Sequence, residues 1–174
     1  MEKITLRYLK KSDKKQFLES LEAAWGEFPY AHYWETLANK DFDRYVEILP
    51  SFPKGELLPK DHVPCSFLFA FNEDDQLVGR TSIRHKLTDF LLEAGGHIGY
   101  AVLPNERRKG YASAIFKASL EYVRVNLPQI EKVLVTCDEG NIGSEKTISH
   151  NGGVLENIVP TESGINKKRF WIML

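Results

Sequence analysis

The sequence predicts an α/β protein, with a mixed sheet of about seven strands flanked by about four helices. Three observations predict this class. Two segments with helical periodicity follow a short N-terminal strand pattern, most strand patterns come after residue 65, and a strand–helix–strand unit lies between residues 96 and 137. The chain has 174 residues, of which 43% are hydrophobic, so it is long enough to bury one core. We therefore expect residues 1–174 to form a single domain.

The N-terminal part is expected to hold one strand and two helices. Residues 3–8 alternate between apolar and polar side chains, as in a half-buried strand. Ser12 or Asp13 can cap a first helix. A second helix is expected at residues 34–49, because prolines follow it. The proline-rich stretch 50–64 is then a surface loop.

The other elements follow at short intervals. Residues 65–71 and 76–86 flank a polar turn and indicate a β-hairpin. A right-handed crossover then places the start of its helix at the carboxyl end of the preceding strand, where ligands bind. The remaining elements are expected as a strand at 96–103, a helix at 109–126, a strand at 132–137, a helix at 142–150 and strands at 154–159 and 168–174.

Charge, hydropathy and cysteine usage exclude several classes of protein. Lys and Arg number 23 and Asp and Glu 24, so nucleic-acid binding through a general positive field is excluded. No apolar stretch is long enough to cross a bilayer, and the N-terminus lacks the apolar region of a secretion signal. Cys65 and Cys137 lie far apart, so we expect neither a disulfide framework nor a zinc site. A cytoplasmic location fits best.

The most informative segment joins the strand expected at 96–103 to the helix that follows. Three consecutive cations, at residues 107–109, precede the small residues Gly110 and Ala112. Backbone N–H groups of a first helical turn have no intrahelical acceptor, so they can bind a phosphate. A solvated basic turn is the alternative interpretation. A phosphate-loop NTPase is excluded because GxxxxGK[ST] is missing, and a dinucleotide fold is disfavoured because no GxGxxG opens this helix.

This segment resembles the acetyl-CoA motif of the GNAT N-acetyltransferase superfamily, Arg/Gln-x-x-Gly-x-Gly/Ala. The motif is present as Arg107-x-x-Gly110-x-Ala112. A second signature, Asn141-x-x-Ser144, and the order of elements over nearly the whole chain resemble the same family. Residues 95–100 and 136–138 are similar to a bacterial subgroup of predicted acetyltransferases. The resemblance implies one N-acetyltransferase domain with a mostly antiparallel sheet, splayed between its fourth and fifth strands.

The resemblance also implies a cosubstrate, acetyl-CoA, and no metal. The amides of residues 108–113 would hold the pyrophosphate, and the neighbouring cations would add counter-charge. The pantetheine arm would bind strand backbone as an added strand, and an N–H near Val102 would hold the oxyanion. Asn141 would contact the arm with Ser144 as a weaker companion, or would cap the helix that follows, or both. The implied cofactor-binding residues are Tyr100, Ala101, Val102, Arg107, Arg108, Lys109, Gly110, Tyr111, Ala112, Ser113, Asn141 and Ser144.

The acid and base are harder to assign. Many family members carry a carboxylate on the strand before the Asn signature and a tyrosine seven residues after that Asn, where this chain has Thr136 and Ile148. His97 is a candidate base, since its ordinary pKa suits the role. Strand alternation places it opposite Tyr100, so a core histidine is the alternative. Tyr100 is a candidate acid, or a residue that only packs on the cofactor.

Two functions are consistent with these residues. The first is transfer of the acetyl group of acetyl-CoA to a primary amine of a small molecule or peptide, by direct attack on the thioester. The second is a catalytically degenerate CoA-binding sensor or scaffold, which Thr136 and Ile148 would favour. The expected partners are acetyl-CoA and an amine acceptor, without nucleic acid or membrane, and a homodimer is one option for assembly. Aromatic residues between 25 and 34 are expected in the core or the acceptor groove.

Overall fold

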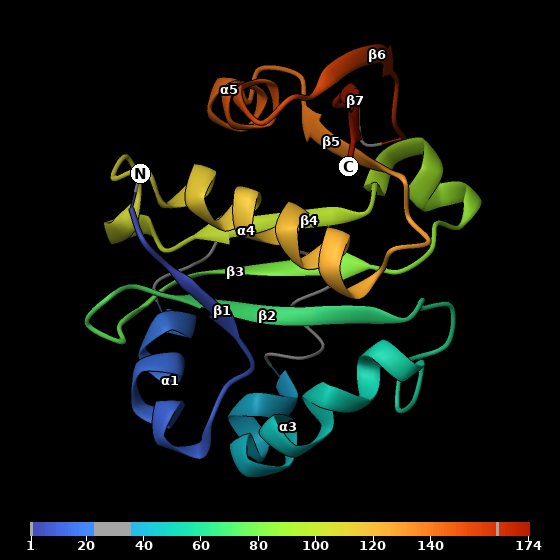
Figure 1. Ribbon diagram of the computed structural model, residues 1–174. Coiled ribbons are helices and arrows are strands. Elements are labelled where there is room, and N and C mark those ends of the chain that lie inside the picture. Colours follow the sequence, from blue (N-terminus) through green and yellow to red (C-terminus); the bar gives the residue numbers. More distant parts are fainter. Residues whose placement is uncertain (1, 23–35, 163) are drawn as a thin grey trace.

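Seven strands form two hydrogen-bonded sheets in the computed structural model, which describes residues 2–22, 36–162 and 164–174. All the strand pairs are antiparallel. No strand pairing connects β4 to β5, so the splay predicted between the fourth and fifth strands is confirmed (Figure 1). The first sheet has the order β1 (Thr5–Arg7), β2 (Cys65–Phe71), β3 (Leu77–Arg84), β4 (Ile98–Val102), and the second has the order β5 (Lys132–Asp138), β7 (Lys167–Met173), β6 (Val154–Val159).

Helices cover both faces of the first sheet. Helix α4 (Tyr111–Asn126) crosses one face, and α1 (Lys14–Glu22) and α3 (Phe42–Ile48) lie against the other (Figure 1). The alternation of β2 explains this arrangement, because Phe67 and Phe69 pack with α1 and α3 whereas Leu68 packs with α4. Helix α5 (Ile142–His150) packs against β5 and α4, beyond the splay.

Two parts of the chain differ from the sequence prediction. The helix predicted at 34–49 is interrupted at Asp41, because the Asp41 carboxylate accepts a hydrogen bond from the Arg44 N–H (3.0 Å) and so caps α3 as a separate helix. The loop predicted at 50–64 begins as a 3₁₀ helix. The short helical turns are η1 (Lys11–Asp13), η2 (Leu49–Lys54), η3 (Leu91–Gly95) and η4 (Pro104–Glu106), of which η3 is a single π-helical turn that the sequence did not predict.

The other elements match their predicted positions to within about three residues. Helix α5 and strand β6 have the predicted bounds. Within residues 2–22, 36–162 and 164–174, no helix combines the length and apolarity that a membrane span requires. The predicted β-α-β unit is formed by β4, α4 and β5. The turn of residues 107–110 joins η4 to the start of α4, beside the splay.

Candidate active site

The turn of residues 107–110, before α4, leaves a row of backbone N–H groups available to bind a ligand. Arg108 and Gly110 have positive φ values of 67° and 89°, and the first hydrogen bond of the helix runs from the Ala114 N–H to the Gly110 carbonyl (3.2 Å). The amides of residues 108–113 donate no hydrogen bond to another described residue. Such a turn, opening on the positive end of a 16-residue helix, fits an anion such as a diphosphate. The predicted anion site therefore has suitable backbone geometry.

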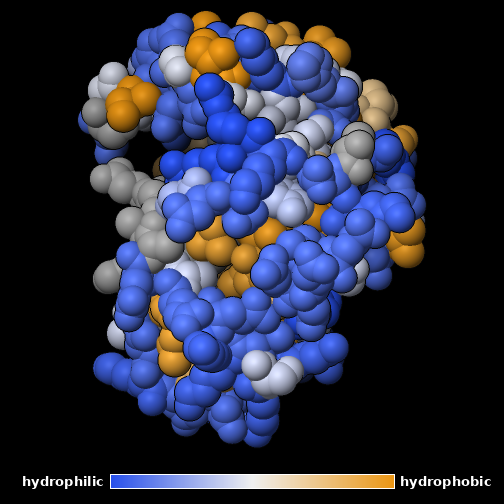
Figure 2. Space-filling view, turned by 90° about the vertical axis from the view of Figure 1, so that its left-hand side faces the viewer, coloured by the Kyte–Doolittle hydropathy of each residue, from blue (hydrophilic) through white to orange (hydrophobic). Residues whose placement is uncertain are grey.

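The three cations of this turn differ in their contacts. Arg107 donates from Nε to the Val102 carbonyl (3.3 Å), which ties the turn to the end of β4. Lys109 forms an exposed ion pair with Glu106 (3.0 Å). Arg108 is exposed and forms no ion pair with a described residue, so its charge is available to a ligand. Figure 2 views the end of the molecule where this turn lies and shows a largely hydrophilic face with a hydrophobic area near its centre.

The edge of β4 that faces the splay is set by the antiparallel ladder with β3. The Arg84 N–H donates to the His97 carbonyl (2.8 Å) and the Leu103 N–H to the Val78 carbonyl (3.0 Å). Hydrogen-bonded pairs alternate along such a ladder, so the backbone of Ala101 faces β3. The N–H and C=O groups of Tyr100 and Val102 therefore face β5. Three residues were expected to bind the pantetheine arm through their backbone. The backbone groups of Tyr100 and Val102 face the splay, and those of Ala101 do not.

The two sheets are joined at His97. The His97 N–H donates to the Leu134 carbonyl (2.7 Å), and the Leu134 N–H donates to His97 Nδ1 (2.9 Å). His97 is 7% exposed; its burial, helped by the charge of Arg84, lowers its pKa to about 4. The imidazole is therefore neutral at pH 7, with Nδ1 as a hydrogen-bond acceptor. Action as a general base at Nδ1 would require the bond from Leu134 to break.

Tyr100 lies between the two halves of the structure. Its hydroxyl is 2.9 Å from Ser144 Oγ, on α5, and its ring packs on Phe116 of α4, with 5.2 Å between the ring centroids. Burial raises the pKa of Tyr100, and the hydrogen bond with Ser144 opposes that shift. The phenol therefore holds its proton at neutral pH. The structure thus brings together two residues that the sequence placed separately, a candidate acid and a residue of the Asn signature.

The residues of the Asn signature also shape the end of the splay. Asn141 Oδ1 accepts a hydrogen bond from the Ser144 N–H (3.1 Å), so Asn141 is the N-cap of α5. At the other end of the helix, Asn151 donates to Ser113 Oγ (3.3 Å). The end of α5 therefore lies next to the start of α4 and its free amides. These contacts form a second wall beside the turn of residues 107–110.

The two positions that depart from the family pattern have structural partners. Thr136 donates from Oγ1 to the Ala94 carbonyl (2.8 Å) in η3. Ile148 is fully buried. Arg84 donates from Nη1 to the Gly95 and Gly96 carbonyls (3.3 and 3.0 Å) on the same segment. Sequence reasoning missed this packing of residues 94–96, and the only local signal for it was the Gly-Gly pair before His97.

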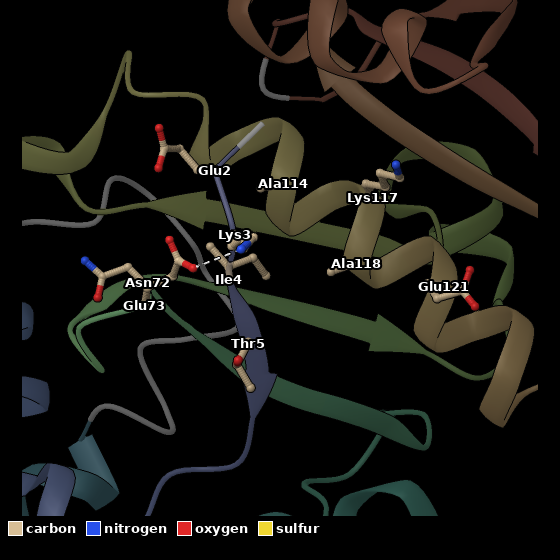
Figure 3. Close-up of a pocket in the computed structure, with 10 residues that line it drawn as sticks. All are labelled: Glu2, Lys3, Ile4, Thr5, Asn72, Glu73, Ala114, Lys117, Ala118 and Glu121. Atoms are coloured by element: carbon tan, nitrogen blue, oxygen red, sulfur yellow. Dashed lines mark ion pairs between the residues drawn. The ribbon is translucent and has the colours of Figure 1, made fainter.

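A groove elsewhere on the molecule does not fit the diphosphate. It has a volume of about 670 Å³ and lies between β1 and α4, on the flank of α4 away from α5 (Figure 3). Its carboxylates outnumber its cations, and the cation Lys3 is already paired with Glu73 (3.3 Å). Among the described residues, no group of three His, Cys, Asp or Glu side chains could hold a metal ion. The aromatic residues between 25 and 34 lie outside the described residues.

Comparisons with known proteins identify the family and agree with the fold. A chimeric form of the spermidine N-acetyltransferase SpeG from Vibrio cholerae has a TM-score of 0.64 at 18% identity, over 98% of this chain and 95% of that one. A proposed ribosomal-protein-serine acetyltransferase from Vibrio cholerae has a TM-score of 0.65 at 14% identity, over 100% and 95%. No curated protein sequence matches the chain. The family model described as acetyltransferase (GNAT) domain matches residues 3–154. The chain therefore belongs to the GNAT acetyltransferase family.

Proposed function

We propose that this chain transfers the acetyl group of acetyl-CoA to a primary amine of a small molecule or peptide, and that residues 1–174 act as one domain. The observation that supports this most strongly is the row of amides at residues 108–113, which have no acceptor within the described part of the chain and lie next to the open edge of β4. Membership of the GNAT family supports acetyl transfer as the reaction. The proposed acceptor is an amine, because amines attack a thioester carbonyl directly and the similar SpeG structure is named as a spermidine N-acetyltransferase.

The turn of residues 107–110, with the start of α4, and the edge of β4 have distinct roles in this proposal. The amides of residues 108–113, with Arg107, Arg108 and Lys109, bind the diphosphate. The backbone groups of Tyr100 and Val102 bind the pantetheine arm as an added strand would be bound. The Val102 N–H polarises the thioester carbonyl and then holds the oxyanion, a contribution of about 3 kcal/mol for one well-placed donor.

The hydroxyl pair of Tyr100 and Ser144 supports a route for the leaving group. The amine nitrogen bonds to the acetyl carbon and the carbonyl pair moves to the oxyanion. When that pair re-forms the carbonyl, the carbon–sulfur bond breaks and the departing thiolate needs a proton. The Tyr100 hydroxyl holds its proton at neutral pH and has a second hydroxyl 2.9 Å away. Tyr100 is therefore the proposed acid, with Ser144 as its hydrogen-bond partner. The amine attacks in its neutral form, and its nitrogen in the tetrahedral intermediate then gives a proton to solvent water, which leaves the neutral amide.

Two measurements test this function. Calorimetric titration with acetyl-CoA should show binding, and no binding at millimolar cofactor would end the proposal. Free-thiol release should then rise when an amine is added to enzyme and acetyl-CoA. The panel should include spermidine and a serine-containing peptide, because the similar structures are named for those acceptors. Binding without turnover for any amine would instead support the CoA-binding sensor or scaffold, the alternative that Thr136 and Ile148 favour.

We also propose a cytoplasmic location. Cys65 and Cys137 are both free thiols, as a reducing compartment would allow. A homodimer stays a prediction, and sedimentation analysis of the purified chain would test it.

A further inference from the structure

We propose that His97 is a positioning residue that fixes the point at which the two sheets separate. Its imidazole takes the place of a backbone carbonyl at the last hydrogen bond between β5 and the segment that leads into β4. The inference deepens the proposed acetyl transfer and rests on it for its effect on turnover. It assigns to His97 a role other than the base that the sequence made a candidate.

Both backbone polar groups of His97 are already hydrogen-bonded, so only its imidazole can accept from the Leu134 N–H. The His97 carbonyl accepts from the Arg84 N–H (2.8 Å), and its N–H donates to the Leu134 carbonyl (2.7 Å). The Leu134 N–H therefore has the ring nitrogen, at 2.9 Å, as its acceptor. Leu134 is fully buried, so losing that acceptor would leave a buried N–H without a partner. The side chain thus completes a contact that a regular ladder makes with backbone alone.

The backbone on either side of His97 allows little adjustment. Gly96 has φ +68°, and a Cβ there would lie 2.6 Å from the Leu134 carbonyl oxygen, so only glycine fits. Arg84 holds the Gly96 carbonyl at 3.0 Å. Thr136 holds the Ala94 carbonyl at 2.8 Å, a second tether from β5 to this segment. The junction between the sheets is therefore held from both sides, with the imidazole at its centre.

The junction sets the position of the β4 edge. Val102 is five residues beyond His97, about 16 Å along an extended strand, so a small rotation at the junction becomes a displacement at the Val102 N–H. Misplacing a catalytic group by about 1 Å can cost on the order of 100-fold in rate. His97 thus acts through the backbone of Tyr100 and Val102, without touching the reacting atoms.

Two variants of similar shape separate this role from general-base catalysis. His97→Asn places an amide oxygen where Nδ1 stands, and it does not titrate. His97→Leu has nearly the shape of Asn but offers no acceptor. We expect H97N to keep kcat and the KM for acetyl-CoA within about threefold of the natural enzyme, and H97L to lose about 10- to 100-fold in kcat/KM. The pH profile of H97N should keep the shape of the natural profile.

A readout without turnover makes the test independent of the acceptor. Amide hydrogen exchange at Leu134 should stay slow in the natural protein and in H97N and become faster in H97L, while circular dichroism confirms that both variants fold. If H97N is as inactive as H97L and loses the acidic limb of the pH profile, His97 is the base and the proposal fails. Equal protection of Leu134 in all three proteins would also overturn it. If no amine is acetylated but Leu134 exchange is slow in the natural protein and in H97N and faster in H97L, only the proposed function fails.

Discussion

The hydroxyl oxygens of Tyr100 and Ser144 lie 2.9 Å apart, although one residue belongs to β4 and the other to α5. This contact connects the two walls of the splay near the free edge of β4. A phenol in this position keeps its proton at neutral pH, because burial raises its pKa. The same contact therefore links the two walls and keeps a protonated phenol beside the splay.

Tyr100→Phe should lower kcat about 10- to 100-fold, because the variant keeps the ring packing on Phe116 and loses only the hydroxyl. The dissociation constant for acetyl-CoA should change little. Ser144→Ala should have a smaller effect, since it removes the partner and not the acid. The rate of thiol release, in stopped-flow or steady-state assays, gives kcat for both variants. A Y100F enzyme with the natural kcat would remove Tyr100 from catalysis.

Neutral substitution of the exposed cations should weaken acetyl-CoA binding. We expect Arg108→Gln to raise the dissociation constant about tenfold and to reduce its dependence on salt, because one charge near the diphosphate is lost. Arg124→Gln is the matched control, since Arg124 is an exposed cation at the far end of the same helix. Calorimetric titration at two salt concentrations checks this. Equal affinities for R108Q and the natural protein would mean that only the backbone amides hold the phosphates.

Gly110→Ala should reduce both stability and cofactor affinity. Gly110 has φ +89°, and an L-residue in that region costs about 1–2 kcal/mol. There is room for the added methyl group, whose nearest neighbour would be 3.7 Å away, so the cost is in the backbone. Gly143→Ala in α5 is the control, and its unfolding free energy should stay equal or rise by up to about 1 kcal/mol. Urea unfolding of both variants measures the difference, and an equal effect of the two substitutions would contradict the argument.

Acid should destabilise the protein through His97. Its pKa is about 4 in the folded protein and ordinarily 6.5, so the unfolded chain takes up the proton first as the pH falls. Stability is therefore fully present above pH 6.5 and is lost between pH 6.5 and 4, by about 3 kcal/mol in total. His85, whose pKa burial also lowers, acts in the same direction.

The His97→Asn variant isolates this dependence, because Asn does not titrate. Its unfolding free energy should fall less between pH 7 and pH 4.5 than that of the natural protein, and the remaining slope should reflect His85 and the carboxylates. Urea unfolding at both pH values gives the comparison. Parallel losses in the two proteins would show that His97 titrates alike in the folded and unfolded states.

Several features of the site were predictable because they depend on neighbouring residues. The turn before α4 follows from consecutive cations and a glycine that opens a helix, and the N-cap role of Asn141 follows from its place before α5. Periodicity alone did not predict where a side chain accepts a hydrogen bond from the backbone and so interrupts a helix. Asp41 caps its own helix, so the helix predicted through that position is two shorter ones.

The sequence by itself determined the order of strands and helices, the family motif and the cation-rich turn, because periodicity and capping are short-range properties of the chain. Only the tertiary structure decided which backbone groups face the splay and which groups His97 hydrogen-bonds. The hydrogen bond from Leu134 to His97 joins residues 37 positions apart, and that between Tyr100 and Ser144 joins residues 44 apart. Such contacts depend on how the two sheets pack, which no local pattern specifies.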